Sequence, residues 1–432
     1  MIVRRHKASP QPSRIEFGTS APRERELSTE SCIKATSTHS PFSLSRVLKF
    51  KSMKSRILNF TLFATLYIQP PMLRPFYLLF ALALTFVGLQ CQSPQTSATV
   101  QFDAEQAPYP RLSDYAFFTG KLKDLAPNTG VVPYAPITPL FSDYAHKARY
   151  VWMPEGQQAR VDEEGWIEFP DNTVLIKNFY YPADFRRPGE EWDMVETRLL
   201  AKRQGKWEAF TYVWNADDTE AELNVVGGFA EVNWTDEAGR ARSLEYAIPN
   251  KNQCKSCHNR RQEILPIGPR VRHLNRDFAY PDGSTANQLA KWQEAGILAA
   301  GDWAARFAPL PDWDDPQSGT VEERALAYLE VNCGHCHHPE GPAHTTGMYL
   351  TTDFRQERGK LGFCKAPVAA GKGSGGRLFG IAPGQPDSSI LAYRMEANDP
   401  GVMMPEIGRA IPHEEGIALI REWIAGLPEG CP

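Results

Sequence analysis

Six residues whose side chains bind metals and cofactors occur in two groups of identical spacing. The chain contains two copies of one pattern, Cys254-Lys-Ser-Cys257-His258 and Cys333-Gly-His-Cys336-His337. We call residues 254–258 the first motif and residues 333–337 the second motif. Thiols at this spacing are typical of structural zinc sites, of redox-active dithiols and of covalent cofactor attachment.

Covalent haem attachment uses all three residues that the two copies share, the two Cys and the His that follows the second Cys. Two thiols add across the two vinyl groups of a haem, and the next residue, His, reaches the iron. A zinc site would not require His directly after the second Cys in both copies. A thioredoxin-like dithiol would lie in a βαβ pattern, which the sequence does not indicate. We therefore expect two covalently attached haem c groups, with His258 and His337 as iron ligands.

Two predicted helices flank the second motif. Thr320 and Glu323 form a capping box, and apolar residues at helical spacing then lead into Cys333. A second apolar stripe begins near residue 413 and ends at Gly426. Between the two helices lies a loop rich in Gly and Pro that contains Val402-Met403-Met404-Pro405. A thioether on such a loop suits the free face of a haem.

The segment from about 318 to 428 resembles a mono-haem cytochrome c domain in its helix, CxxCH motif, Met-Pro loop and terminal helix. The resemblance implies that Met404 is the second ligand of this haem iron, with Met403 as the alternative. Met348 and Met395 are lesser candidates. His/Met ligation would raise the reduction potential and favour electron acceptance from a dehydrogenase.

The first motif has fewer recognisable partners. No Met lies between His258 and Cys333. The sixth iron ligand is therefore His273, a residue from the preceding domain such as Met153 or Met194, or a water molecule at an open iron. Three nearby arginines are either partners of the haem propionates or plain surface charges: Arg270, Arg272 and Arg276.

Four further residues with reactive side chains have simpler interpretations. Cys364 and Cys431 are expected to form a disulfide in an oxidising compartment, and two free thiols are the alternative. His335 and His338 lie within or beside the second motif and are interpreted as solvated or supporting residues rather than ligands.

The region before the first motif has the pattern of antiparallel strands. Period-two segments separated by turn residues predict strands over 148–153, 165–169, 173–181, 194–203, 206–214, 229–234 and 241–248. Strands 194–203 and 206–214 are predicted to form a hairpin around Gln204-Gly205, and strands 229–234 and 241–248 a second hairpin. Strands of this length and spacing favour a sandwich whose tryptophans fill the core. The predicted fold class is α+β multidomain, an N-terminal antiparallel β-sandwich followed by an all-α cytochrome c-like dihaem region.

An export signal precedes these regions. Met72 begins a short basic segment, and an uncharged apolar run from 76 to 89 leads to Cys91 and a polar tail. The run is about 14 residues long, shorter than the roughly 20 needed to span a bilayer. Its end resembles a bacterial lipoprotein signal, which would anchor the chain to a membrane through a lipid on Cys91; ordinary cleavage nearby is the alternative. Both place the protein in the periplasm or cell envelope. A competing start is Met53.

The chain thus divides into six predicted segments. They are a disordered or untranslated leader (1–71), a signal peptide (72–91), a linker (92–108), a β-sandwich domain (109–250), a first haem c segment (251–317) and a cytochrome c-like domain with the second haem (318–428). Residues from about 105 to 428 resemble a poorly characterised family of bacterial dihaem c-type cytochromes. Supporting sequences are residues 252–258, 266–269, 274–277 and the segment from the second motif to Met404-Pro405.

Charge limits the class of partner. The whole chain has a formal net charge of −4, but residues 1–71 hold 12 basic and 4 acidic residues and the rest holds 35 and 47. An acidic chain is not a nucleic-acid binder, and it favours basic protein partners.

The resemblance implies single-electron transfer with a redox protein partner, a dehydrogenase, oxidase or cytochrome. The alternatives are a dihaem enzyme that resembles the bacterial cytochrome c peroxidases, with an open first haem, and a ligand-binding sandwich that recruits a redox enzyme.

Overall fold

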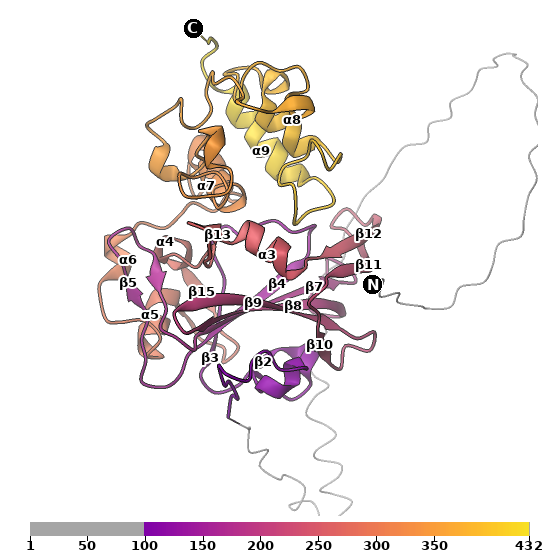
Figure 1. Ribbon diagram of the computed structural model, residues 1–432, viewed down its shortest axis with the longest axis vertical. Coiled ribbons are helices and arrows are strands. Elements are labelled where there is room, and N and C mark those ends of the chain that lie inside the picture. Colours follow the sequence, from indigo (N-terminus) through magenta and orange to yellow (C-terminus); the bar gives the residue numbers. More distant parts are fainter. Residues whose placement is uncertain (1–98, 432) are drawn as a thin grey trace, which may run out of the picture. The chain divides into compact units, whose positions relative to one another are not determined.

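A six-stranded antiparallel sheet is the largest element of the computed structural model, which describes residues 99–431 (Figure 1). The leader, the signal peptide, Cys91 and the first part of the linker lie outside the described residues. The strand order is β10-β9-β8-β7-β4-β3. The strands are β3 (Val131–Tyr134), β4 (His146–Trp152), β7 (Val174–Pro182), β8 (Trp192–Arg203), β9 (Lys206–Trp214) and β10 (Ala221–Leu223).

Turn residues explain how consecutive strands pair. β8 and β9 form a hairpin around Gln204 and Gly205, both of which have positive φ, as a tight two-residue turn requires. The second predicted hairpin is formed by β11 (Gly228–Thr235) and β12 (Ala241–Ile248), which pair along their whole length. Both hairpins were predicted from the alternation of apolar residues and the turn residues between them.

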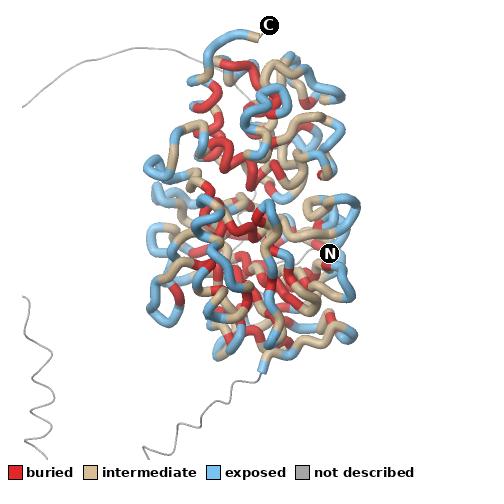
Figure 2. Tube along the Cα trace, turned by 90° about the vertical axis from the view of Figure 1, so that its left-hand side faces the viewer, coloured by how far each residue is buried: buried red, intermediate tan, exposed pale blue. Residues whose placement is uncertain are grey.

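Each face of the sheet is covered by a different part of the chain. One face packs against the segment that contains the 3-10 helix η1 (Leu112–Tyr115) and the short strands β1 (Phe118–Thr119) and β2 (Ala126–Pro127). The other face packs against α4 (Val271–Leu274) and α5 (Gln288–Glu294). Figure 2 shows buried residues in the interior of the described part and exposed residues in its loops.

The predicted β-sandwich is therefore wrong. A sandwich requires a second sheet against the first, but the second layer here consists of short helices and of the two-stranded ribbon β11–β12. Val271, Leu274 and Trp292 supply apolar surface to the core that contains Val151 and Leu175 of the sheet. Alternation within a strand shows that a face is buried, and it does not show which element buries it.

The predicted all-α region is also wrong. After α3 (Lys251–Cys257) the chain forms two short ribbons, β13 (Asn259–Arg260) with β14 (Glu263–Ile264) and β15 (Asp277–Ala279) with β16 (Thr285–Asn287). The sequence pattern over 286–298 is helix-like, but α5 covers only Gln288–Glu294, and residues 285–287 pair in β16. A one-turn helix, α6 (Trp303–Arg306), follows, and another ribbon is formed by β5 (Arg160–Val161) and β6 (Ile167–Glu168).

The C-terminal part holds three helices connected by long loops. These are α7 (Val321–Asn332), α8 (Ile390–Glu396) and α9 (Glu414–Ala425), and α7 packs against α9 around Leu329 and Ile420. Between α7 and α8 the described chain forms loops and four 3-10 helices: η3 (His344–Thr346), η4 (Thr352–Phe354), η5 (Gly371–Ser374) and η6 (Pro386–Ser388).

Local predictions in this part are confirmed where a specific side-chain contact carries them. Thr320 accepts a hydrogen bond from the Glu323 amide, and the Glu323 side chain accepts one from the Thr320 amide. Cys364 and Cys431 form the predicted disulfide, with 5.3 Å between their Cα atoms. In residues 99–431 no helix combines the length and the apolar character needed to cross a membrane.

Candidate functional site

Helix α3 presents the first motif on the sheet. Asn250 and Gln253 cap the helix reciprocally, each side chain accepting from the other residue's amide. The helix packs against β9 (Figure 1), which buries Cys254. Burial raises the pKa values of the Cys254 and Cys257 thiols. Both cysteines are free thiols, as are Cys333 and Cys336.

The ring of His258 is oriented by a backbone carbonyl. Its Nδ1 lies 2.9 Å from the Leu265 oxygen, so that Nδ1–H donates to this carbonyl. A histidine held in this way keeps the lone pair of Nε2 for a metal ion. Burial lowers the pKa of His258 to about 4, which keeps the ring in the neutral form that ligates metals.

The second motif has the same arrangement at the end of a different helix. Helix α7 ends at Asn332 and delivers Cys333, whose amide donates to the Leu329 carbonyl. The Nδ1 of His337 lies 3.2 Å from the Met348 oxygen, which again leaves Nε2 without that bond. Burial lowers the pKa of His337. It raises the pKa values of Cys333 and Cys336 to about 12.

The two motifs lie beside each other, which the sequence did not predict. The charge of Cys257 contributes to the raised pKa of Cys336, and the charge of His258 contributes to the lowered pKa of His335. Glu340, which follows the second motif, pairs with both arginines that follow the first. Its Oε2 lies 2.7 Å from the Arg260 Nε, and Arg261 contacts the other oxygen.

The loop with the candidate ligand Met404 is close to the second motif. The Arg409 Nε donates to the Met404 oxygen at 3.1 Å, and the Arg394 Nε donates to the Val402 oxygen at 2.7 Å. The charge of Arg394 contributes to the lowered pKa of His337, and the charge of Arg409 opposes the rise in the pKa of Cys333. Met404 is half-buried, whereas the alternative Met403 is buried.

The candidate ligand His273 belongs to a buried ion cluster. Its Nε2 lies 3.3 Å from the Glu330 Oε1, the Arg272 Nε lies 3.0 Å from the same oxygen, and the Arg270 Nη1 lies 3.5 Å from it. Glu330 is on α7, so the cluster connects α4 with the helix of the second motif. Arg276 lies 4.0 Å from Asp312. The three arginines considered as propionate partners therefore face carboxylates of the chain itself.

A set of basic residues on the sheet was missed by sequence reasoning. Arg149 on β4 lies opposite Lys177 on β7, which lies opposite Arg198 on β8. We call Arg149, Lys177 and Arg198 the cationic row. The basic residues in this strand pattern were visible, but strand pairing was needed to place them side by side.

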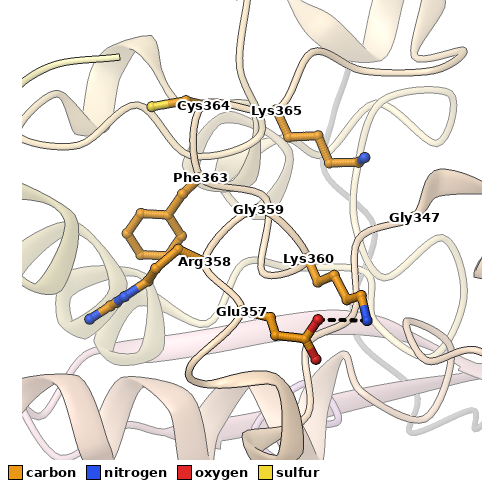
Figure 3. A pocket seen from close by; sticks show the side chains of 8 residues that line it. All are labelled: Gly347, Glu357, Arg358, Gly359, Lys360, Phe363, Cys364 and Lys365. Carbon is orange, nitrogen blue, oxygen red and sulfur yellow. Dashed lines mark ion pairs between the residues drawn. The ribbon is translucent and has the colours of Figure 1, made fainter. Parts of the chain in front are cut away.

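In residues 99–431 no three His, Cys, Asp or Glu side chains form a metal-binding group. A haem iron does not require one, because the porphyrin supplies four of its ligands. A hollow of about 590 Å³ is lined by the eight residues drawn in Figure 3, none of which belongs to a motif. The ion pair between Lys360 and Glu357, at 2.6 Å, lies at its edge.

No protein-family model, curated protein or solved structure matches the chain.

Proposed function

We propose that the chain carries two covalently attached haem c groups, one on each motif, and transfers single electrons between a redox protein partner and a respiratory chain. The proposal includes the periplasm or cell envelope as the location. The chain is held at a membrane by a lipid on Cys91 or is released by ordinary cleavage near that residue. The partner is a dehydrogenase, an oxidase or another cytochrome.

One observation carries the proposal. Both motifs combine free thiols at CxxC spacing with a His whose Nδ1 faces a backbone carbonyl, at 2.9 Å for His258 and 3.2 Å for His337. A zinc site would need four converging ligands, and the described residues contain no such group. The thiols and the neutral imidazoles fit covalent haem attachment with one axial ligand from each motif.

The residues of the chain have separate roles in this proposal. Cys254, Cys257, Cys333 and Cys336 would form the thioether bonds, and a haem at each motif would supply a one-electron couple. The carbonyls of Leu265 and Met348 orient the two histidines. The pairs of Glu340 with Arg260 and Arg261 hold the motifs together. Short separation between redox groups is what electron transfer between them requires.

A dihaem enzyme of the peroxidase type is the second candidate. It is favoured by the environment of His273, whose Nε2 faces Glu330 and not the first motif. An iron at His258 without a second protein ligand would be open to a small substrate such as peroxide. No contact among the described residues tests either candidate for the second iron ligand. His273 for the first haem and Met404 for the second haem both stay predictions.

The spin state of the two irons tests the proposal against this alternative. The full chain is expressed with haem maturation machinery and examined by electron paramagnetic resonance and by stopped-flow mixing with a reduced c-type cytochrome. Electron carriage predicts rapid exchange of electrons and no consumption of peroxide. A high-spin iron together with catalytic peroxide turnover would support the enzyme and contradict the proposal. His337→Ala is the variant that should slow the exchange.

A further inference from the structure

The cationic row is an unusual arrangement for the middle of a sheet. Arg149, Lys177 and Arg198 occupy directly opposed positions on three neighbouring strands, β4, β7 and β8. Neighbouring strands lie about 4.8 Å apart, so the three side chains start within roughly 10 Å of one another. Like charges directly opposite on neighbouring strands destabilise a sheet. A negatively charged group in contact with the row would offset this repulsion and stabilise the sheet.

The described residues supply only part of this negative charge. Glu196 pairs with Arg198, with 2.9 Å between the Arg198 Nε and the Glu196 Oε2. Arg149 is 9% exposed, and neither its side chain nor that of Lys177 has a hydrogen-bond or ion-pair partner among residues 99–431. The Lys177 Nζ lies 4.7 Å from the centroid of the Phe179 ring. Burial, together with the charge of Arg149, lowers the pKa of Lys177 well below its usual range. Glu196 thus pairs with Arg198, whereas no carboxylate among residues 99–431 pairs with Arg149 or Lys177. Lys147, two residues before Arg149 on β4, adds a fourth basic side chain to this face; burial lowers its pKa, and the charge of Asp143 opposes that decrease.

The row lies on the side of the sheet that carries the first motif. Thr211 on β9 is opposite Arg198, and its hydroxyl group hydrogen-bonds the Cys254 thiol. The charges of Lys177 and Arg198 both act to lower the pKa values of His258 and Cys257, so these groups lie close to one another. An anionic group attached at the first motif would therefore meet these side chains.

We propose that the cationic row is a carboxylate-binding site that holds the two propionates of the haem attached at the first motif. The inference rests on the proposed function and adds residues that the motifs do not contain. Arg149 and Lys177, the two side chains of the row without a carboxylate partner among the described residues, offer one basic group to each of the two propionates. A guanidinium group binds a carboxylate through two parallel hydrogen bonds, and an ammonium group adds a point charge. Arg270 and Arg272 do not compete for this role, because both already face Glu330.

The test uses the full chain loaded with haem and compares variants by resonance Raman spectroscopy of the propionate bending bands. Lys177→Met and Arg149→Met each remove one charge of the row, and Lys177→Arg keeps it. The matched control is Lys206→Met, which removes the same charge from an exposed position at the start of β9. We expect shifted bands in both Met variants of the row, and bands like those of the parent in Lys177→Arg and Lys206→Met.

Mass spectrometry on the same samples separates this inference from the proposed function. Unchanged propionate bands in Lys177→Met and Arg149→Met, with two haems still attached, would overturn the propionate assignment alone. A parent chain without covalent haem would overturn the proposed function on which the assignment rests.

A free anion is the other source of the same chemistry, and inorganic phosphate is the probe for it. Calorimetric titration of the haem-loaded parent should show no phosphate binding, because the propionates occupy the row. Phosphate binding to the parent that is lost in Lys177→Met would show that the row is open to external anions, and it would contradict the assignment.

Discussion

At the scale of single residues, several buried charged side chains of this protein contact groups of opposite charge. Glu330 is the clearest case, because its carboxylate receives contacts from Arg272, Arg270 and His273. Burial alone would raise the pKa of Glu330, but the hydrogen bond from His273 and the charges of the two arginines hold it well below its usual range. The carboxylate therefore remains charged in the folded state and compensates the positive charge of the two arginines.

Replacing this carboxylate should destabilise the fold. Glu330→Gln leaves the buried arginines uncompensated, and we expect a loss of about 3–5 kcal/mol in the free energy of unfolding, measured with urea at neutral pH. The matched control is Glu322→Gln on the same helix, which removes a partner of Arg358 at the surface. It should cost less than about 1 kcal/mol. Equal losses in both variants would contradict the role of the cluster.

The effect of Glu330→Gln on the free energy of unfolding should decrease as the pH falls. A carboxyl whose pKa is lowered on folding contributes stability that is complete above its unfolded value, 4.5 here, and is lost as the pH falls below it. The difference in unfolding free energy between the parent and Glu330→Gln should therefore shrink below about pH 4.5. A difference that stays constant down to acid unfolding would show that the charge of Glu330 is not the cause.

At the scale of helices and strands, the sequence was informative where the cause was local. The capping residues of α7 and the turn of the β8–β9 hairpin are short-range features, and both were predicted correctly. The partner layer of the sheet was not predictable in this way, since Leu274 and Trp292 lie far along the chain from the strands they cover. The proximity of the two motifs and the alignment of the cationic row also depend on contacts between residues that lie far apart in the sequence. The disulfide was a correct long-range prediction, because four of the eight cysteines belong to the motifs and two more, Cys32 and Cys91, lie in the predicted leader and signal peptide. Cys364 and Cys431 were the two that remained.

The disulfide gives the element scale its own test. Cys364 and Cys431 close a loop of 67 residues in sequence separation, which restricts the unfolded chain. The double variant Cys364→Ser/Cys431→Ser should lose about 2–4 kcal/mol of unfolding free energy, measured by urea titration without reductant. The parent treated with reductant is the control and should lose a similar amount. A double variant as stable as the oxidised parent would contradict this account.

At the scale of the whole molecule, the chain brings the first and second motifs together across a long sequence separation. Arg260 and Glu340 form the direct link, and the cluster around Glu330 joins the region of α4 to α7. Residues 72–432 hold 35 basic and 47 acidic residues, an excess of negative charge that propionates would increase. Under the proposed function, this charge would steer basic protein partners toward the chain. Haem groups on the two neighbouring motifs would then pass electrons to each other and to one group outside the chain.

The number of covalently attached haems tests the central claim most directly. Intact-mass analysis and pyridine haemochrome absorbance are applied to the chain matured in cells that attach haem c, and to two variants, Cys254→Ser/Cys257→Ser and Cys333→Ser/Cys336→Ser. We predict two haems on the parent and one on each variant. A parent that carries no covalent haem, or that binds zinc through the same cysteines, would contradict the account.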